Sequence, residues 1–224
     1  MPEEDPAKPT RPVLDPMERA SEVLFGLIMV LTFTIGERLI PSETLDSREL
    51  VVAAIGCNIA WGVIDAVLFL LGVLFWRSER ARFFRSLKRA HSQAEALQAV
   101  RDEFGFEDEP LAVLPEDRAR LHQAIIALAS HAPEAHAKLK KGDFEAAFVV
   151  FVLVSATALP GVIPFIVLGN SFLALRLSNT LLLLLLFVVG YWWGHYTDAK
   201  PWIVGSAVLL LGLSMVLVAV ALGG

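Results

Sequence analysis

The stretch VVAAIGCNIAWGVIDAVLFLLGVLFW, residues 51–76, contains only two strongly polar side chains, Asn58 and Asp65. As an α-helix it would extend for about 39 Å, which is enough to cross a bilayer with some tilt. Helices of soluble proteins rarely stay apolar on every face over such a length. The stretch therefore predicts a membrane-spanning helix, in an integral membrane protein whose main partner is the lipid bilayer.

Asp65 lies near the middle of this stretch. An ionised carboxylate at that depth costs on the order of 3 kcal/mol on insertion scales. Asn58 precedes Asp65 by seven residues, two helical turns back, and Trp61 falls between them on nearly the same face. We expect these three side chains to face protein or water, with lipid on the opposite side of the helix.

The overall composition is typical of a membrane protein, since 55% of the residues are hydrophobic and 19% are charged. No basic cluster is interleaved with aromatic residues on a soluble module, so nucleic acid is not an expected partner. Cys57 is the single cysteine, which leaves no disulfide framework and no CxxC metal motif. No nucleophile–base pair and no HExxH motif stands out, so we do not expect an enzyme.

Four further apolar runs predict the other membrane helices and give an all-α fold with five spans. They occupy residues 21–40, 144–168, 172–196 and 202–222, with Ser21 as the expected N-cap of the first. Pro160 and Pro164 interrupt the third of the five spans. Residues 1–20 are rich in proline and charge, and we predict that they form a disordered tail.

Residues 77–143 differ from their surroundings because they hold twelve of the nineteen lysines and arginines. The second membrane helix should end at Arg77. Apolar residues at helical spacing then predict an amphipathic helix over 84–104, Pro115 should open another, and a short helix should follow Pro133. The predicted organisation is a tail (1–20), two membrane helices (21–76), a small cytoplasmic helical domain (77–143) and three membrane helices (144–224).

The basic block also predicts the orientation in the membrane, because lysine and arginine concentrate in cytoplasmic loops. The domain after the second helix is then cytoplasmic, and the N-terminus starts on the same side. With five spans, the C-terminus ends outside.

Asp65 is the strongest candidate for a functional residue, because a carboxylate at the midplane can bind a cation or exchange a proton. The alternative is that Asp65 is permanently protonated or hydrogen-bonded and holds helices together. Asn58 is open to the same two interpretations. Cys57 and Met29 offer sulfur ligands but are equally consistent with packing. Glu22, near the cytoplasmic end of the first helix, is either part of an entrance or a solvated interface acid.

Small residues recur at four-residue intervals in the predicted spans. The pairs are Gly56 with Ala60, Gly62 with Ala66, and Gly190 with Gly194. Such pairs permit close helix contact and favour self-association, without identifying the partner.

Two spans, a cytoplasmic helical insert and three spans with a proline-broken third together resemble the vacuolar iron transporter family. Val23-Leu24-Phe25-Gly26 resembles the opening of the family's first helix, and Ala158-Leu159-Pro160 through Pro164-Phe165 is similar to its double-proline span. The ending from Pro201-Trp202 to Leu222-Gly223-Gly224 resembles bacterial members, which implies a bacterial inner membrane. Met29 and Val30 stand where the family usually carries an Asp-Gly pair, and arginine-rich sequence replaces its acidic cytoplasmic clusters.

The resemblance implies a homodimeric transporter that exports a divalent cation, Fe²⁺ or Mn²⁺, from the cytoplasm in exchange for protons. Asp65 would be the principal metal ligand or proton carrier, with Asn58 and Cys57 as secondary ligands, Met29 as a soft contact and Glu22 at the entrance. No cofactor beyond the transported ion is expected. The competing hypothesis is a non-transporting membrane module on the same scaffold, whose basic cytoplasmic domain binds lipid or a protein partner.

Overall fold

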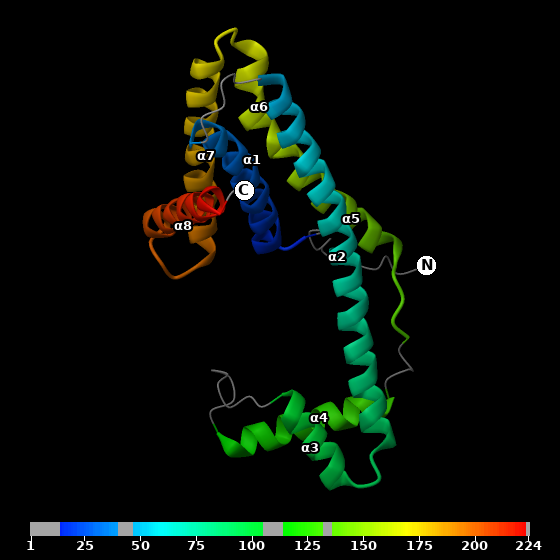
Figure 1. Ribbon diagram of the computed structural model, residues 1–224. Coiled ribbons are helices and arrows are strands. Elements are labelled where there is room, and N and C mark those ends of the chain that lie inside the picture. The colour runs from blue at the N-terminus through cyan, green and yellow to red at the C-terminus, as the bar shows by residue number, and fades with distance from the viewer. Residues whose placement is uncertain (1–13, 40–46, 105–113, 132–135, 223–224) are drawn as a thin grey trace, which may run out of the picture. The chain divides into compact units, whose positions relative to one another are not determined.

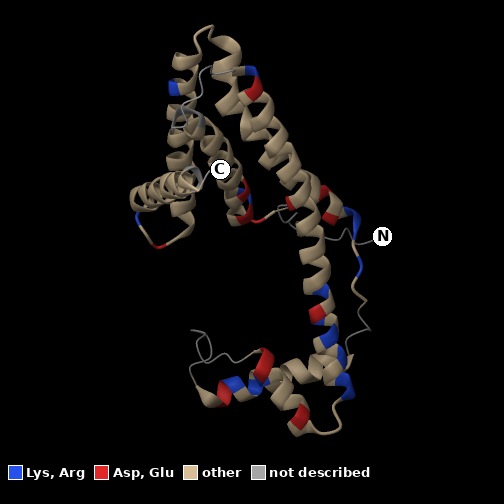
Figure 2. Ribbon diagram, viewed as in Figure 1, with Lys and Arg blue, Asp and Glu red and all other residues tan. Residues whose placement is uncertain are grey.

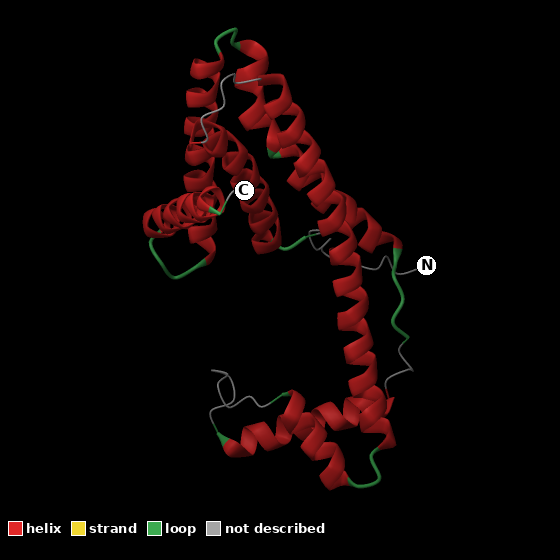
Figure 3. Ribbon diagram, viewed as in Figure 1, coloured by secondary structure: helices red, strands yellow, loops and turns green. Residues whose placement is uncertain are grey.

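The computed structural model describes residues 14–39, 47–104, 114–131 and 136–222 of the chain. In this part of the chain every regular element is a helix (Figure 3). Five helical segments of the described residues are long and apolar enough to cross a membrane: Pro16–Gly36, Ser47–Arg89, Lys141–Val167, Ser171–Tyr196 and Pro201–Val218. The predicted all-α fold with five membrane spans is therefore confirmed.

The chain divides into two compact units. We call Met1–Phe69 together with Lys141–Gly224 the membrane unit, and Leu70–Lys140 the insert. Figure 2 shows that the helices of the membrane unit carry few charged residues away from their ends, whereas the insert carries charges of both signs along its helices. This contrast in polarity governs where each unit can hold a binding site.

Helix α1, Pro16–Leu39, begins before the predicted N-cap at Ser21. Asp15 caps it instead: Asp15 Oδ1 accepts from Met17 N at 2.9 Å, and Glu18 Oε2 accepts from Asp15 N at 3.0 Å. This reciprocal capping box, with proline at the first helical position, starts the helix within the charged segment. Ser21 lies inside the helix, where its hydroxyl donates to Glu18 O. Of the predicted tail, residues 1–13 lie outside the described residues.

Helix α2, Ser47–Arg89, is 43 residues long, or about 65 Å. The prediction that it ends at Arg77 is wrong, because the arginines, glutamate and leucine that follow the apolar stretch are themselves good helix formers. Ser92 then caps α3, Gln93–Glu103, by accepting from Glu95 N at 3.1 Å. The amphipathic helix predicted over 84–104 is thus divided between the end of α2 and α3.

The third span consists of two helices, α5 (Lys141–Ala156) and α6 (Ala158–Val167), separated at Thr157. Pro160 explains the break, because it has no N–H to donate to the carbonyl of Ala156 and its ring crowds that carbonyl. Pro164 lies inside α6. The break therefore falls one turn ahead of the prolines.

Helix α7, Ser171–Trp193, is followed by a short 3-10 turn, η1 (Gly194–Tyr196), and packs against α8, Pro201–Ala221 (Figure 1). A Cβ at Gly190 would lie 2.7 Å from Val208 Cβ, so the two backbones are close. The core of the membrane unit lies where α7 meets α1, α6, α8 and the start of α2. Its most buried large side chains are Leu27, Leu31, Leu182 and Leu186.

The insert packs the last part of α2 against α3 and α4, Pro115–His131, which begins at the proline that was predicted to open it. Its core is small and consists of Leu87, Ala96, Val100 and Ala129. Residues 136–140 are not helical, so the helix predicted to follow Pro133 is absent over these residues. A hydrogen bond of 2.7 Å from Arg77 Nη1 to Lys138 O holds this segment against α2.

Candidate functional site

Asn58 is completely buried and joins α2 to α1 and α5. Its Nδ2 donates to Gly26 O at 3.3 Å, Val154 O at 3.1 Å and Thr157 Oγ1 at 3.0 Å. Thr157 Oγ1 donates its own proton to Val154 O at 2.6 Å, so it can only accept from Asn58. We call this cluster the Asn58 junction. Through its amide nitrogen, Asn58 bonds α2 to α1, to α5 and to Thr157.

The Asn58 junction lies at the break between α5 and α6. A break in a membrane helix frees backbone carbonyls, which at membrane depth must find a partner within the protein. Here Val154 O accepts hydrogen bonds from Asn58 Nδ2 and from Thr157 Oγ1. Gly26 lets α1 approach this point, because a Cβ there would overlap Thr157 Oγ1.

Three oxygen atoms along the contact between α2 and α5 are buried and have no hydrogen-bond partner among the described residues. They are Asn58 Oδ1, Ser155 Oγ and Asp65 Oδ2. Gly62 lies one turn after Asn58 and one turn before Asp65, and a Cβ on it would lie 2.9 Å from Ser155 Oγ. Ser155 is therefore placed on the same side of α2 as Asn58 and Asp65. We call these three residues the polar seam.

Buried polar atoms nearly always have a partner, and leaving one without costs about 1–3 kcal/mol. Three of them in line at membrane depth form a set of oxygen ligands that water, a proton or a cation can complete. Two further atoms of this kind in the described residues, Arg19 Nε and Asn179 Oδ1, belong to α1 and α7.

Asp65 is half-buried, with one oxygen enclosed and the side chain as a whole still accessible. Glu22 on α1 is also half-buried and lies near enough for the charges of the two carboxylates to interact. Trp61, predicted to share a face with Asn58 and Asp65, is 39% exposed. It packs edge-to-face on Phe25 with the ring centroids 5.5 Å apart. The structure thus brings Asp65 and Glu22 together and places Trp61 beside them.

Cys57 and Met29 lie next to the Asn58 junction, Cys57 immediately before Asn58 and Met29 one turn after Gly26 on α1. Both are partly buried, and Cys57 is a free thiol. No three His, Cys, Asp or Glu side chains of the described residues come together as a metal site. A site in the membrane unit must therefore use amide and hydroxyl oxygens as well as carboxylates.

Ser155 and Thr157 were missed by the sequence analysis. Both are small hydroxyl residues in an otherwise apolar helix, immediately ahead of Pro160. That position was a usable signal, because side-chain hydroxyls commonly bond the carbonyls of proline-broken membrane helices.

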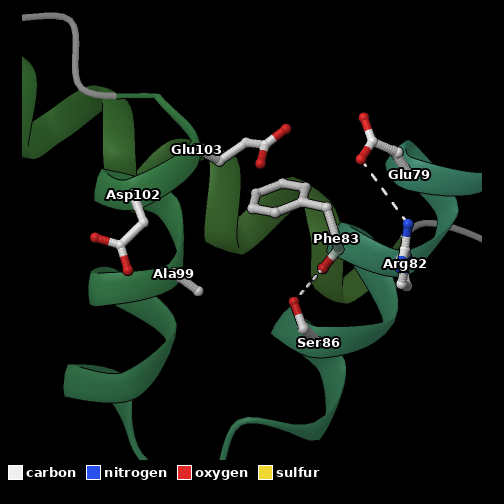
Figure 4. Close-up of a pocket in the computed structure, with 7 residues that line it drawn as sticks. All are labelled: Glu79, Arg82, Phe83, Ser86, Ala99, Asp102 and Glu103. Carbon is white, nitrogen blue, oxygen red and sulfur yellow. Dashed lines mark hydrogen bonds and ion pairs between the residues drawn. The ribbon is translucent and has the colours of Figure 1, made fainter. Parts of the chain in front are cut away.

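The insert contains an acid-lined hollow of about 420 Å³, formed by Glu79, Arg82, Phe83, Ser86, Ala99, Asp102 and Glu103 (Figure 4). Asp102 points away from Glu79, with the Phe83 ring between them, whereas Glu103 extends toward Glu79 (Figure 4). Glu79 contacts Arg82 at 3.8 Å, and Asp102 accepts from Gln98 Nε2 at 2.8 Å. These partners leave the hollow poorly suited to a cation.

Comparison with known families gives one result that bears on this geometry. The family model described as the VIT family matches residues 75–224, more than half of the chain. No curated protein matches the sequence. The matched residues include α5 with Ser155 and Thr157, whereas Asn58 and Asp65 on α2 precede them.

Proposed function

Because this integral membrane protein belongs to the VIT family, whose members are metal ion transporters, we propose that it moves a divalent cation, Fe²⁺ or Mn²⁺, along the polar seam. The observation that supports this route is the line of three buried oxygens that have no hydrogen-bond partner among the described residues, Asn58 Oδ1, Ser155 Oγ and Asp65 Oδ2. Buried oxygens that only join helices usually accept a hydrogen bond from the protein.

In this proposal Asp65 is the principal ligand or proton carrier, because it supplies the one charge of the seam. Asn58 contributes only its Oδ1, since its nitrogen is committed to the Asn58 junction. Ser155 contributes a neutral oxygen. Glu22, which interacts with Asp65, receives the ion at one end. Cys57 and Met29 are outlying soft contacts that favour transition metals over Mg²⁺ or Ca²⁺.

We further propose export from the cytoplasm in exchange for protons, across a bacterial inner membrane, with the N-terminus inside and the C-terminus outside. Two carboxylates near enough for their charges to interact support proton exchange, because a bound dication or a bound proton relieves their repulsion. The excess of lysine and arginine in residues 77–143 supports the orientation.

A homodimer through α2 completes the proposal. The side of α2 opposite the seam exposes apolar residues, among them Val52, Ile59 and Val63. Gly56 on the same helix is exposed, and a Cβ there would meet no atom within 4 Å. An exposed small residue among apolar side chains allows the close approach of a second helix.

Metal uptake into proteoliposomes with Fe²⁺ or Mn²⁺ tests the proposed route. Asp65→Asn should lower the flux by about tenfold or more, since losing a charged ligand raises the barrier by more than about 1.4 kcal/mol. Asp102→Asn, which removes an acid of the insert that Gln98 already binds, is the control and should leave the flux within about twofold. Full flux in the Asp65 variant would overturn the assignment of the seam.

The second candidate is a membrane module that does not transport. It is supported by Met29 and Val30 where the family's Asp-Gly pair is expected, and by the lack of a three-acid metal cluster among the described residues. Its basic insert would then bind lipid or a protein partner. Absence of flux for both metals, in protein whose thermal unfolding shows that it is folded, would favour this function.

A further inference from the structure

The insert contains a second cavity, of about 400 Å³, that differs in chemistry from the acid-lined hollow. It is lined by Ser78, Ala81, Arg85, His136, Ala137 and Lys138. The cavity exists because Arg77 Nη1 donates to Lys138 O at 2.7 Å and draws the 136–140 segment alongside α2. Ala81, only 3% exposed, is small enough to leave room at its floor.

Three of the six lining side chains carry or accept positive charge, and none is acidic. Arg85 presents a guanidinium, Lys138 an ammonium and His136 an imidazole. The acid nearest in sequence, Glu79, contacts Arg82, which does not line this cavity. Arg85 and Lys138 line one space together with Ser78, and a guanidinium, an ammonium and a hydroxyl are the groups that bind phosphate in proteins.

Both walls of the cavity are chain segments that lead directly into membrane spans. Ser78 comes two residues after Trp76, the last residue of the apolar stretch, so it lies about 3 Å further along the helix. Trp76 is 74% exposed, as expected of an aromatic residue at the bilayer interface. On the other wall, Lys138 precedes the start of α5 at Lys141 by three residues. The cavity therefore lies at the depth of lipid headgroups.

We propose that this cavity binds the phosphate of an anionic phospholipid. A zwitterionic lipid carries a choline that the lining cations would repel, whereas an anionic headgroup adds no positive charge. Basic pockets next to membrane helices bind anionic headgroups in this way. The proposal does not depend on transport, and it gives the basic insert a defined ligand.

Native mass spectrometry of the full chain in detergent, with phosphatidylglycerol or phosphatidylcholine added, tests the proposal. The wild-type chain should bind phosphatidylglycerol preferentially. Arg85→Gln combined with Lys138→Gln should lower that binding by about tenfold or more, because two surface cations are removed. The matched control is Arg82→Gln, a neighbouring arginine of α2 outside the cavity, which should change binding by less than about threefold.

Each of the other results would overturn part of the proposal. Equal binding of the two lipids, or an equal loss in the Arg82 variant, would show general attraction to a basic surface and no site in the cavity. Displacement of phosphatidylglycerol by millimolar inorganic phosphate alone would assign the cavity to a soluble phosphate compound. Thermal unfolding checks the fold of the double variant, and its charge-keeping counterpart, Arg85→Lys with Lys138→Arg, should retain the lipid preference.

Discussion

The membrane unit and the insert differ in the burial of their polar side chains. In the membrane unit Asn58 is completely buried, and the oxygens of the polar seam have no hydrogen-bond partner among the described residues. In the insert the Arg82–Glu79 ion pair has side chains that are 68% and 51% exposed, and those of Arg120–Asp117 are 78% and 55% exposed. Bulk water reaches the exposed ion pairs of the insert, whereas the oxygens of the seam are enclosed by the protein.

The comparison shows why the number of charged residues does not indicate where the function lies. The insert holds 21 of the 43 charged residues in less than a third of the chain, yet each exposed ion pair is worth about 0–1 kcal/mol. The membrane unit holds few polar groups, but each has a large effect because the alternative to a partner is hydrocarbon. Substitutions in the two units should therefore differ in size, and the following predictions test that difference.

The largest effect on stability is expected from Gly26→Leu at the Asn58 junction. A side chain there overlaps Thr157 Oγ1 and must separate α1 from the α5–α6 break. We expect a loss of about 3 kcal/mol or more in the free energy of unfolding, seen as a lower melting temperature in detergent. Gly72→Leu is the control, because Gly72 is exposed, a Cβ there meets nothing within 4 Å, and the residue is not part of the proposed dimer contact. Equal melting temperatures for the two variants would contradict the close packing at Gly26.

Asn58→Ala should have the next largest effect. It removes three buried contacts and leaves part of the helix break without a donor. The expected loss is about 1–3 kcal/mol. Gln98→Ala in the insert removes one exposed hydrogen bond, from Nε2 to Asp102 Oδ1, and should cost at most about 0.5 kcal/mol. If Asn58→Ala and Gln98→Ala lower the free energy of unfolding by the same amount, the proposed difference between the membrane unit and the insert is wrong.

Asp65→Asn should change stability in the opposite direction. The substitution removes a charge from the middle of a membrane helix while keeping the shape of the side chain. We expect a gain on the order of 1 kcal/mol in the free energy of unfolding, alongside the loss of flux. A residue kept for function commonly shows this opposition between activity and stability. A lower melting temperature for Asp65→Asn would indicate a structural role.

Arg82→Ala should have the smallest effect. Its ion pair with Glu79 is 3.8 Å long and largely exposed. Removing it should change the free energy of unfolding by less than about 0.5 kcal/mol, with no change in metal flux. A larger change, measured by thermal unfolding at low and high salt, would show that the insert depends on its charges more than the exposure of this pair indicates.

Much of the fold was readable from the sequence, because the five apolar runs specify five spans whatever their neighbours are. Element ends were less predictable. α1 starts at Pro16 and not at Ser21, since the Asp15–Glu18 capping box was hidden in a charged segment. α2 continues to Arg89, since leaving the apolar stretch does not end a helix made of good helix formers.

The candidate site was predictable only in part. Asn58 and Asp65 stand out as polar residues in an apolar helix, and the structure places them on one seam. Ser155 and Thr157 come from a span nearly a hundred residues later, with separations of 96 and 99 residues for the hydrogen bonds of Asn58 to α5 and the break. Periodicity within one helix cannot reveal which residues of another helix face it. The sequence also could not show that the Asn58 Nδ2 is hydrogen-bonded while its Oδ1 has no partner among the described residues, because that depends on how the helices pack.

The Asn58 junction also restricts how α2 can move. A slide of one helical turn, about 5.4 Å, would break all three bonds of the amide together. A rocking motion of α2 about the Asn58 amide would keep these hydrogen bonds, so the junction acts as a hinge point for α2. If α2 rocks about the junction, widening the gap between α2 and α5 near one leaflet narrows it near the other. Alternating access of an ion site to the two sides of a membrane requires a motion of this kind.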